Sequence, residues 1–147
     1  MSEPTATPNE EQMVVFQLNT ESYGIDIFRV NEIIRMREIT PIPQTEVHVR
    51  GLVNLRGKTI PVVDLRIRFG LESKEDGDST RIIVVDGEHG NVGVVVDAVR
   101  EVVTLQSADV EDAPTIVTDV NSDFVRGIAK CPDGLITLLN LDKALAA

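Results

Sequence analysis

Short apolar runs separated by turn residues dominate the chain from Met13 onward. The runs are rich in Val, Ile and Leu, which favour strands, and they span residues 13–18, 23–27, 52–55, 59–63, 81–85, 92–96, 99–105, 124–129 and 135–139. The connections are rich in Gly, Asn, Asp and Pro, as tight turns require. Nine such runs predict an all-β barrel or sandwich.

Helix is predicted to be minor. One helical turn is indicated by the spacing of Val30, Ile33 and Ile34. Two further short helices are expected after Asp64 and Asn140, because each of these residues can cap a helix that begins with apolar side chains at i and i+4. Residues 65–69 also alternate in a way that would suit a strand, so both interpretations stay open there.

Two parts of the chain resemble one another at fixed offsets. Residues 49–65 align with residues 125–141 without a gap at an offset of 76, and residues 24–34 align with residues 93–103 at an offset of 69. Shared Arg-Gly, Glu and Asp/Asn positions are stronger evidence of similarity than shared Val, Ile or Leu, because aliphatic matches between strands arise easily by chance. We interpret it as an internal duplication of a unit with two hairpins, a short crossover and a closing helical turn. Units of about 65 residues bury little core alone, so we expect them to pack on each other.

Charge and cysteine content narrow the class of protein. The formal net charge of −10 argues against nucleic acid, because binding to such polyanions needs clustered Lys and Arg. The single Cys131 cannot form an internal disulfide, and we find no leader or apolar run of about 18 residues. We therefore expect a cytoplasmic protein without direct membrane insertion. Residues 1–11 lack apolar periodicity and are predicted to form a disordered tail before one domain at residues 12–147.

No group of residues indicates a catalytic site. His48 and His89 lack the spacing of metal ligands and are expected at the surface, and Cys131 has no neighbouring base. Residues 76–78 read Asp-Gly-Asp, but the glutamate that closes a calcium loop is missing. No glycine-rich phosphate loop is present. The sequence thus predicts a protein that is not an enzyme and uses no cofactor and no metal.

Arg56 is the strongest candidate for a binding residue. It ends the apolar run at residues 52–55 and meets a tight Gly-Lys turn. We predict that it pairs with Glu32 beside a partner-binding surface, because a guanidinium can hold a carboxylate and still present donors to a partner. The alternative is a hairpin arginine that only faces solvent.

Several segments together resemble the bacterial chemotaxis coupling proteins of the CheW family. They are Phe-Gln-Leu at 16–18, Tyr-Gly-Ile-Asp-Ile at 23–27, Val-Asn-Glu-Ile at 30–33, Gly-Leu-Val-Asn-Leu-Arg-Gly at 51–57, Ile-Pro-Val-Val-Asp-Leu-Arg at 60–66 and Gly-Val-Val-Val-Asp at 93–97. The similarity runs from about residue 13 to residue 145. It implies two SH3-like β-barrel subdomains packed on a shared core, with short helices, which agrees with the duplication.

The resemblance also implies a function. Such a protein is a non-enzymatic adapter that couples the cytoplasmic tips of methyl-accepting chemoreceptors to the regulatory domain of the histidine kinase CheA. It would act in the cytoplasm at the inner face of the membrane, within receptor arrays, and be monomeric when isolated. Positions that match the family's receptor-facing groove between the barrels are Val30, Glu32, Gly51, Arg56 and Val102. Candidates for the kinase-facing surface are Val14 and Ile27.

Three other interpretations remain open. A CheW-like adapter could serve a parallel circuit in twitching motility, development or second-messenger control, and the residues do not separate these. A small acidic hydrolase would use Asp26, Asp64 or Asp97 with a metal and lose activity with a chelator. An SH3-type peptide-binding module is disfavoured, because such modules use aromatic-lined grooves and aromatic residues make up only 3% of this chain.

Overall fold

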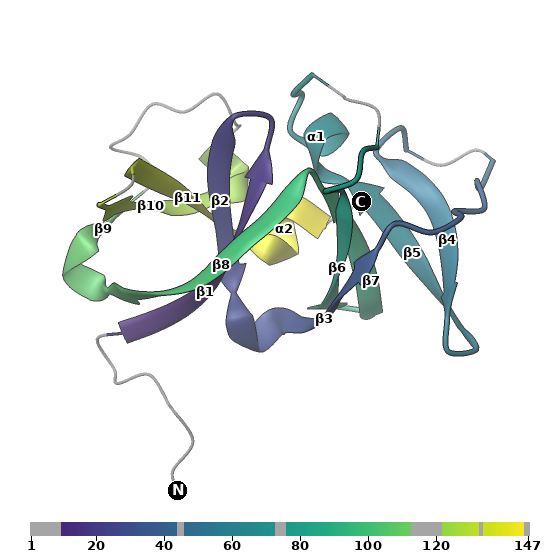
Figure 1. The fold of residues 1–147 in the computed structure, drawn as a ribbon, viewed down its shortest axis with the longest axis horizontal. Helices are drawn as coiled ribbons and strands as arrows, with labels where there is room; N and C mark the ends of the chain where they lie inside the picture. Colours follow the sequence, from purple (N-terminus) through teal and green to yellow (C-terminus); the bar gives the residue numbers. More distant parts are fainter. Residues whose placement is uncertain (1–9, 44–45, 73–75, 113–121, 133, 146–147) are drawn as a thin grey trace, which may run out of the picture.

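Two curled sheets lie side by side in the computed structural model, which describes residues 10–43, 46–72, 76–112, 122–132 and 134–145 (Figure 1). The six-stranded sheet, here called barrel A, has the strand order β8-β1-β2-β11-β10-β9. The five-stranded sheet, barrel B, has the order β3-β6-β7-β5-β4. The predicted all-β fold is confirmed, and so are the two barrels that the family resemblance implies.

The strands and helices have the following bounds. Barrel A contains β1 (Glu10–Leu18), β2 (Glu21–Asp26), β8 (Ala98–Gln106), β9 (Val110–Asp112), β10 (Val125–Cys131) and β11 (Gly134–Leu139). Barrel B contains β3 (Val30–Arg35), β4 (Val49–Leu55), β5 (Lys58–Asp64), β6 (Arg81–Gly87) and β7 (Gly90–Val96). The helical segments are α1 (Leu65–Arg68), α2 (Leu141–Leu145) and the 3-10 turns η1 (Ile27–Arg29), η2 (Ser107–Asp109) and η4 (Ser122–Phe124). Within the described ranges, no helix is long and apolar enough to cross a membrane.

Each of the nine predicted apolar runs coincides with one strand, apart from one to three residues at the ends. The helical turn predicted from Val30, Ile33 and Ile34 is wrong, because these residues lie in strand β3, which pairs with β6. Its β-branched residues suit a strand as well as a helix, and pairing with β6 decides between them. Strand β1 begins at Glu10 and pairs there with Gln106. The last two residues of the predicted tail are therefore strand, whereas residues 1–9 lie outside the described residues.

The two short helices begin where their caps were predicted. The Asp64 side chain accepts a hydrogen bond from the backbone N–H of Arg66 at 3.0 Å. The Asn140 side chain accepts one from the backbone N–H of Lys143 at 3.3 Å. Each cap satisfies a backbone donor at the helix start that would otherwise lack a partner.

Strand pairing repeats at the offsets seen in the sequence. In barrel B, β5 pairs in parallel with β7, with Val62 opposite Gly93. In barrel A, β11 pairs in parallel with β2, with Leu138 opposite Gly24. The internal duplication stays an interpretation, and this common register supports it. The barrels do not coincide with the two sequence units, because the hairpin β1–β2 lies in barrel A and β6–β7 lies in barrel B.

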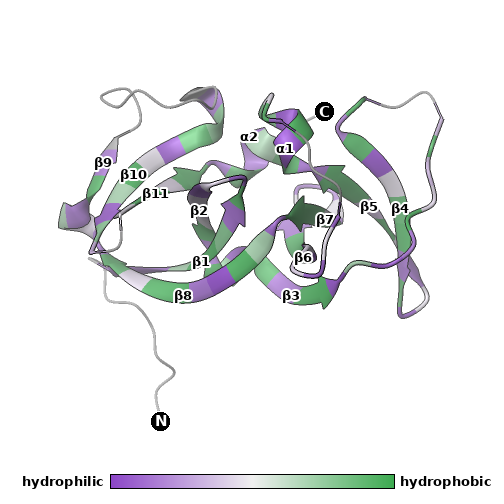
Figure 2. Cartoon of the chain, turned by 45° about the horizontal axis from the view of Figure 1, so that its top comes forward, coloured by the Kyte–Doolittle hydropathy of each residue, from purple (hydrophilic) through white to green (hydrophobic). Residues whose placement is uncertain are grey.

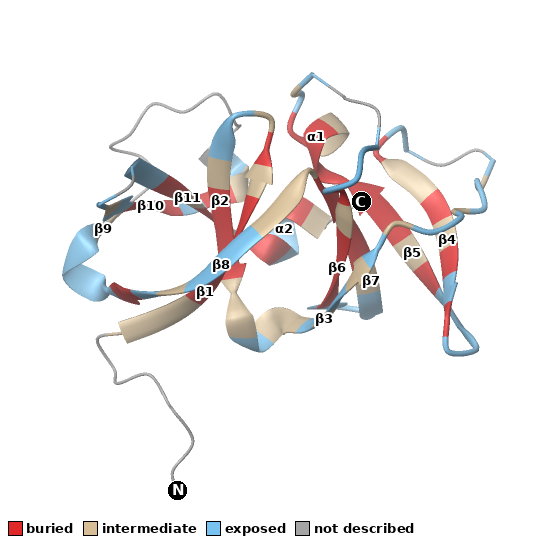
Figure 3. Cartoon of the chain, in the orientation of Figure 1, coloured by how far each residue is buried: buried red, intermediate tan, exposed pale blue. Residues whose placement is uncertain are grey.

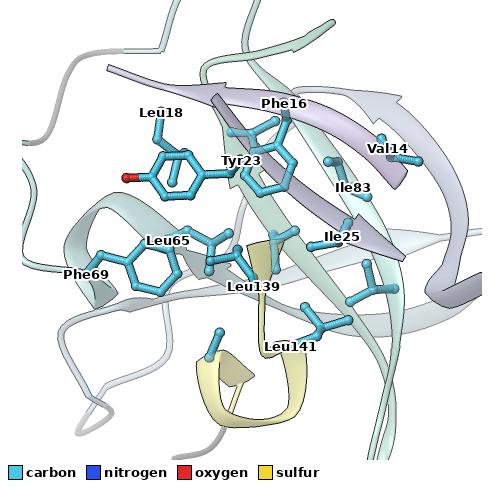
Figure 4. Packing of buried hydrophobic residues seen from close by; sticks show 14 of the residues in the cluster. Val14, Phe16, Leu18, Tyr23, Ile25, Leu65, Phe69, Ile83, Leu139 and Leu141 are labelled. Carbon is cyan, nitrogen blue, oxygen red and sulfur yellow. The ribbon is translucent and has the colours of Figure 1, made fainter. Parts of the chain in front are cut away.

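One apolar core is shared by the two barrels. It gathers side chains from both sheets and both α-helices, including Phe16, Tyr23, Ile83, Leu65 and Leu141 (Figure 4). Buried segments face this region from both sheets in Figure 3, and hydrophobic and hydrophilic residues alternate along strands such as β8 in Figure 2. A smaller apolar cluster fills each barrel separately. The shared core fixes how the two barrels sit relative to one another.

Candidate partner-binding site

The ion pair predicted between Arg56 and Glu32 is present. Arg56 and Gly57 both have positive φ, 52° and 81°, and form the two-residue turn between β4 and β5. Positive φ at both positions is typical of the turn that matches the twist of a hairpin. Nη1 of Arg56 donates to Oε1 of Glu32 at 3.2 Å, and Nη2 contacts Oε2. The turn thus directs the arginine of β4–β5 across to β3.

This pair is exposed enough to meet a partner. The Arg56 side chain is 71% exposed and that of Glu32 is 28% exposed. Exposed ion pairs contribute only about 0–1 kcal/mol to stability. A guanidinium carries five N–H donors, so donors remain available after the pair is made. The pair therefore adds little to the fold and presents a fixed positive group to solvent.

The predicted apolar positions near this pair have different environments. Val30 is half-buried at the start of β3 and packs against the shared core. Val102 on β8 is 51% exposed. Ile33 on β3, which the sequence interpretation did not include, is 42% exposed. Ile33 and Val102 differ by the offset of 69, so they occupy matching positions on the edge strands of the two sheets.

Gly51 is required for a close backbone approach. It is buried in β4 with φ at 143°, and a Cβ there would collide with the backbone carbonyl oxygen of Thr40. Thr40 and Leu52 exchange two backbone hydrogen bonds of 2.8 Å beside it. This packing gives Gly51 a structural role, and the glycine presents no side chain to a receptor.

The two kinase-facing candidates separate in the structure. Val14 is only 3% exposed and belongs to the core, on a strand flanked on both sides by β2 and β8. Its side chain cannot be covered by a partner while the fold is intact, so we no longer assign it to that surface. Ile27 in η1 is half-buried against the shared core, and the adjacent Phe28 is exposed.

A buried charge network around Arg66 was not predicted from the sequence. The Arg66 side chain is 1% exposed and donates to both carboxylate oxygens of Asp64, at 3.1 and 3.0 Å. Its Nη1 also donates to Oδ1 of Asp97 at 2.7 Å. Burial works to lower the pKa of Arg66, but hydrogen bonding and charge from Asp64, with Asp97 and Asp76, raise it above its ordinary value. The arginine is therefore always charged.

The three aspartates of the acidic hydrolase interpretation all have partners within the protein. Asp64 and Asp97 share the guanidinium of Arg66, and Asp26 accepts from the backbone N–H of Phe28 at 2.9 Å. Across the described ranges, no three His, Cys, Asp or Glu side chains gather in a way that would hold a metal. The three carboxylates proposed for a metal thus have structural partners.

The two histidines differ. His89 is exposed in the β6–β7 turn, whereas His48 is only 6% exposed, so the surface prediction for His48 is wrong. The backbone carbonyl of His48 accepts from the N–H of Asp64 at 2.8 Å, which draws the residue inward. Burial, with a smaller effect of the Arg68 charge, lowers the pKa of His48.

A pair of SH3-like barrels on one core, with an exposed ion pair on its surface, is the architecture that this chain shares with a solved scaffolding protein. The model of the CheW-like domain matches residues 12–147, and the chain belongs to that family. It is a scaffold of the chemotaxis type and not an enzyme.

Individual relatives match along nearly the whole chain. The chain is 33% identical to the chemotaxis protein CheW of Bacillus subtilis, over 92% of this chain and 86% of that protein. The identity to CheW of Treponema pallidum is 30%, over 98% and 88%. The crystal structure of the scaffolding protein TtCheW from Thermoanaerobacter tengcongensis superposes with a TM-score of 0.87, at 39% identity and 93% coverage of both chains. Protein FrzA of Myxococcus xanthus is 28% identical, over 92% and 86%.

Proposed function

We propose that this chain couples transmembrane chemoreceptors to the histidine kinase CheA, on the cytoplasmic side of the membrane within receptor arrays. The observation that carries the proposal is the exposed ion pair of Arg56 and Glu32, held in place by a rigid two-residue turn. Its small expected contribution to stability favours a role in binding. Membership in a family of chemotaxis scaffolds suggests that the partners are chemotaxis signalling proteins.

The receptor-facing surface is proposed to comprise Arg56 and Glu32 together with Val30 and Val102. An amphipathic receptor helix would bury its apolar face against the valines and place a polar residue near the guanidinium. In this proposal Gly51 does not contact the receptor through a side chain. It allows the close approach of β4 to the backbone of Thr40. For the kinase, Ile27 remains the candidate, next to the exposed Phe28.

A stiff body suits this role. Side chains from both barrels form one core, so a displacement at one barrel is transmitted to the other and is not absorbed in a linker. Many weak contacts repeated in an array give avidity, so single-site affinities in the micromolar range suffice. The isolated chain is then expected to be monomeric.

The decisive experiment is receptor-coupled kinase activity reconstituted with Arg56→Glu. We expect the variant to fold normally and to abolish activation of CheA by receptor. The new carboxylate would repel Glu32 and would present a negative charge to the partner in place of a positive one. Arg126→Glu is the matched control, since Arg126 is another exposed arginine paired with a glutamate, Glu11, on barrel A. Normal coupling by Arg56→Glu would overturn the proposal.

A charge swap separates contact with the partner from local structure. The double variant Arg56→Glu with Glu32→Arg restores an ion pair across β3 and the β4–β5 turn, but it places the positive charge on the other strand. If Arg56 contacts the receptor, coupling stays lost in the double variant. Recovery of coupling would show that only the pair itself matters.

A parallel circuit is the second candidate. The similarity to a relative that is named FrzA, and not CheW, favours keeping an adapter for another receptor and kinase under consideration. Coupling assays with the receptors and kinases encoded beside this chain's gene would distinguish the two circuits. Both candidate functions require Arg56 to contact the receptor.

A further inference from the structure

Barrel A carries smaller side chains than barrel B at matching positions of one hairpin. In barrel B, the β4–β5 hairpin contributes Val53 and Leu55 to the apolar cluster, followed by Arg56 in the turn. The matching positions of the β10–β11 hairpin, at the offset of 76, are Ala129, Cys131 and Pro132. Three large side chains are thus replaced by smaller ones at the same place in the fold.

A cavity lies beside two of these positions, Cys131 and Pro132. It has a volume of about 470 Å³ and lies between β8 and the β10–β11 hairpin. Its lining includes Glu101, Val103, Leu105, Cys131, Leu135 and Ile136. Leu135 is 58% exposed at its edge. The cavity therefore combines an apolar wall with one carboxylate.

Glu101 is the counterpart of Glu32. The two residues differ by the offset of 69 and lie on β8 and β3, the matching edge strands. Side chains alternate along a strand, so Glu101 shares its face with Val103 and the buried Leu105. Glu32 is paired with Arg56, whereas Glu101 makes no ion pair or side-chain hydrogen bond with any residue in the described ranges.

The cations near this cavity have other partners. Lys130 on the same hairpin pairs with Glu111 at 2.7 Å. Arg100 also lines the cavity, but its Nη1 donates to Oε1 of Gln17 at 3.2 Å. The carboxylate of Glu101 is thus left for a cation from outside the chain.

We propose that this cavity, the mouth of barrel A, binds an exposed turn of a partner protein in which an aliphatic residue is followed by arginine. The aliphatic side chain fills the space beside Cys131, and the arginine pairs with Glu101. The partner's aliphatic residue and arginine would make the contacts in barrel A that Leu55 and Arg56 make in barrel B, where Leu55 packs in the apolar cluster and Arg56 pairs with Glu32. The site does not include Arg56, and although it shares β8 with the receptor-facing surface, Val102 lies on the other face of that strand from Glu101.

The chain itself provides the probe. The peptide acetyl-Asn-Leu-Arg-Gly-amide has the sequence of residues 54–57. Titrated into the ¹⁵N-labelled full chain, it should shift amide resonances around Glu101, Cys131 and Leu135 with an affinity near the millimolar range, since one exposed ion pair and one small apolar contact are weak. The peptide with Gln in place of Arg should bind about threefold or more weakly.

Two variants test the assigned contacts. Glu101→Gln should weaken binding of the arginine peptide about threefold or more, whereas Glu38→Gln, an equal charge change at an exposed residue outside the cavity, should leave it unchanged. Cys131→Leu places the barrel B residue in the cavity and should prevent binding while the amide spectrum stays folded. Absence of shifts at the cavity, or equal binding by wild type and Glu101→Gln, would overturn the proposal.

Discussion

Arg66 and Arg56 are ten residues apart but lie in opposite environments. The Arg66 side chain is enclosed by the carboxylates of Asp64 and Asp97, while Arg56 faces solvent beside Glu32. A buried charge that loses its partner is costly, whereas an exposed pair is screened by water. Stability should therefore depend on Arg66 and binding on Arg56.

We expect Arg66→Met to lower the free energy of unfolding by about 3–5 kcal/mol, because it leaves the buried Asp64 carboxylate without its cation. Arg56→Met should change the same quantity by about 1 kcal/mol or less. Urea unfolding followed by circular dichroism measures both. Equal losses for the two variants would contradict the separation of their roles.

His48 should make stability depend on pH. Its pKa in the folded chain is lowered by burial, so the unfolded chain binds more protons as pH falls through the ordinary histidine value of about 6.5. The stabilising contribution is complete above that value and is lost as pH falls toward the folded pKa. The difference in unfolding free energy between wild type and His48→Gln should therefore shrink between pH 7.5 and pH 5.5, two values chosen around the histidine pKa. A constant difference would show that His48 does not titrate in this way.

Prediction at the residue scale succeeded where a turn marks the position of a side chain. Arg56 ends an apolar run at a Gly-containing turn, and a hairpin places such a residue at a barrel rim within reach of Glu32. The Arg66 network gave no such signal, because the burial of the guanidinium and its contact with Asp97, 31 residues away, follow only from the fold, although Asp64 is two residues away. The burial of Val14 could not be seen either, since both strands that flank it must first be placed.

At the scale of elements, the hairpins were predictable, whereas the edge strands β3 and β9 were not. Hairpin strands such as β4 and β5 are marked by turn residues and by apolar runs. Strand β3 carries Val and Ile at positions that suit either one helical turn or a strand, and pairing with β6 decides. Strand β9 has only three residues and exists through its pairing with β10. These two edge strands thus depend on their neighbours more than on their own sequence.

Gly51→Ala should weaken the junction between β4 and the segment at Thr40. The positive φ alone costs about 1–3 kcal/mol for a residue with a side chain, and the collision with the Thr40 carbonyl adds to this. Hydrogen exchange should show loss of protection at the amides of Thr40 and Leu52, which bond across this junction.

Gly77→Ala is the matched control, because a Cβ there meets nothing within 4 Å. It should change stability by less than about 1 kcal/mol. If Gly51→Ala lost receptor coupling while Thr40 and Leu52 stayed protected, Gly51 would have to act directly at the receptor-facing surface.

At the scale of the whole molecule, the chain exchanges hairpins between its two barrels. The hairpin β1–β2 is followed by β3, β4 and β5, but it lies in barrel A with β8 and β11. The hairpin β6–β7 is inserted between β3 and β5 of barrel B. Asp97 links the β1–β2 turn to helix α1 by hydrogen bonds. Its carboxylate accepts from the backbone N–H of Asn19 at 2.6 Å and from the side chain of Arg66 at 2.7 Å. Each barrel is thus completed by the opposite half of the chain.

Two half-chains, residues 1–72 and 73–147, should therefore be unfolded alone and fold when mixed. The first half carries β3, β4 and β5 without the hairpin that lies between β3 and β5, so two strands lose their hydrogen-bonding partners and the shared core stays open. Well-dispersed amide resonances should appear only in the equimolar mixture, with a midpoint that depends on concentration. A half that folds cooperatively alone would mean that its own strands close a barrel, and that the exchange of hairpins is dispensable for folding.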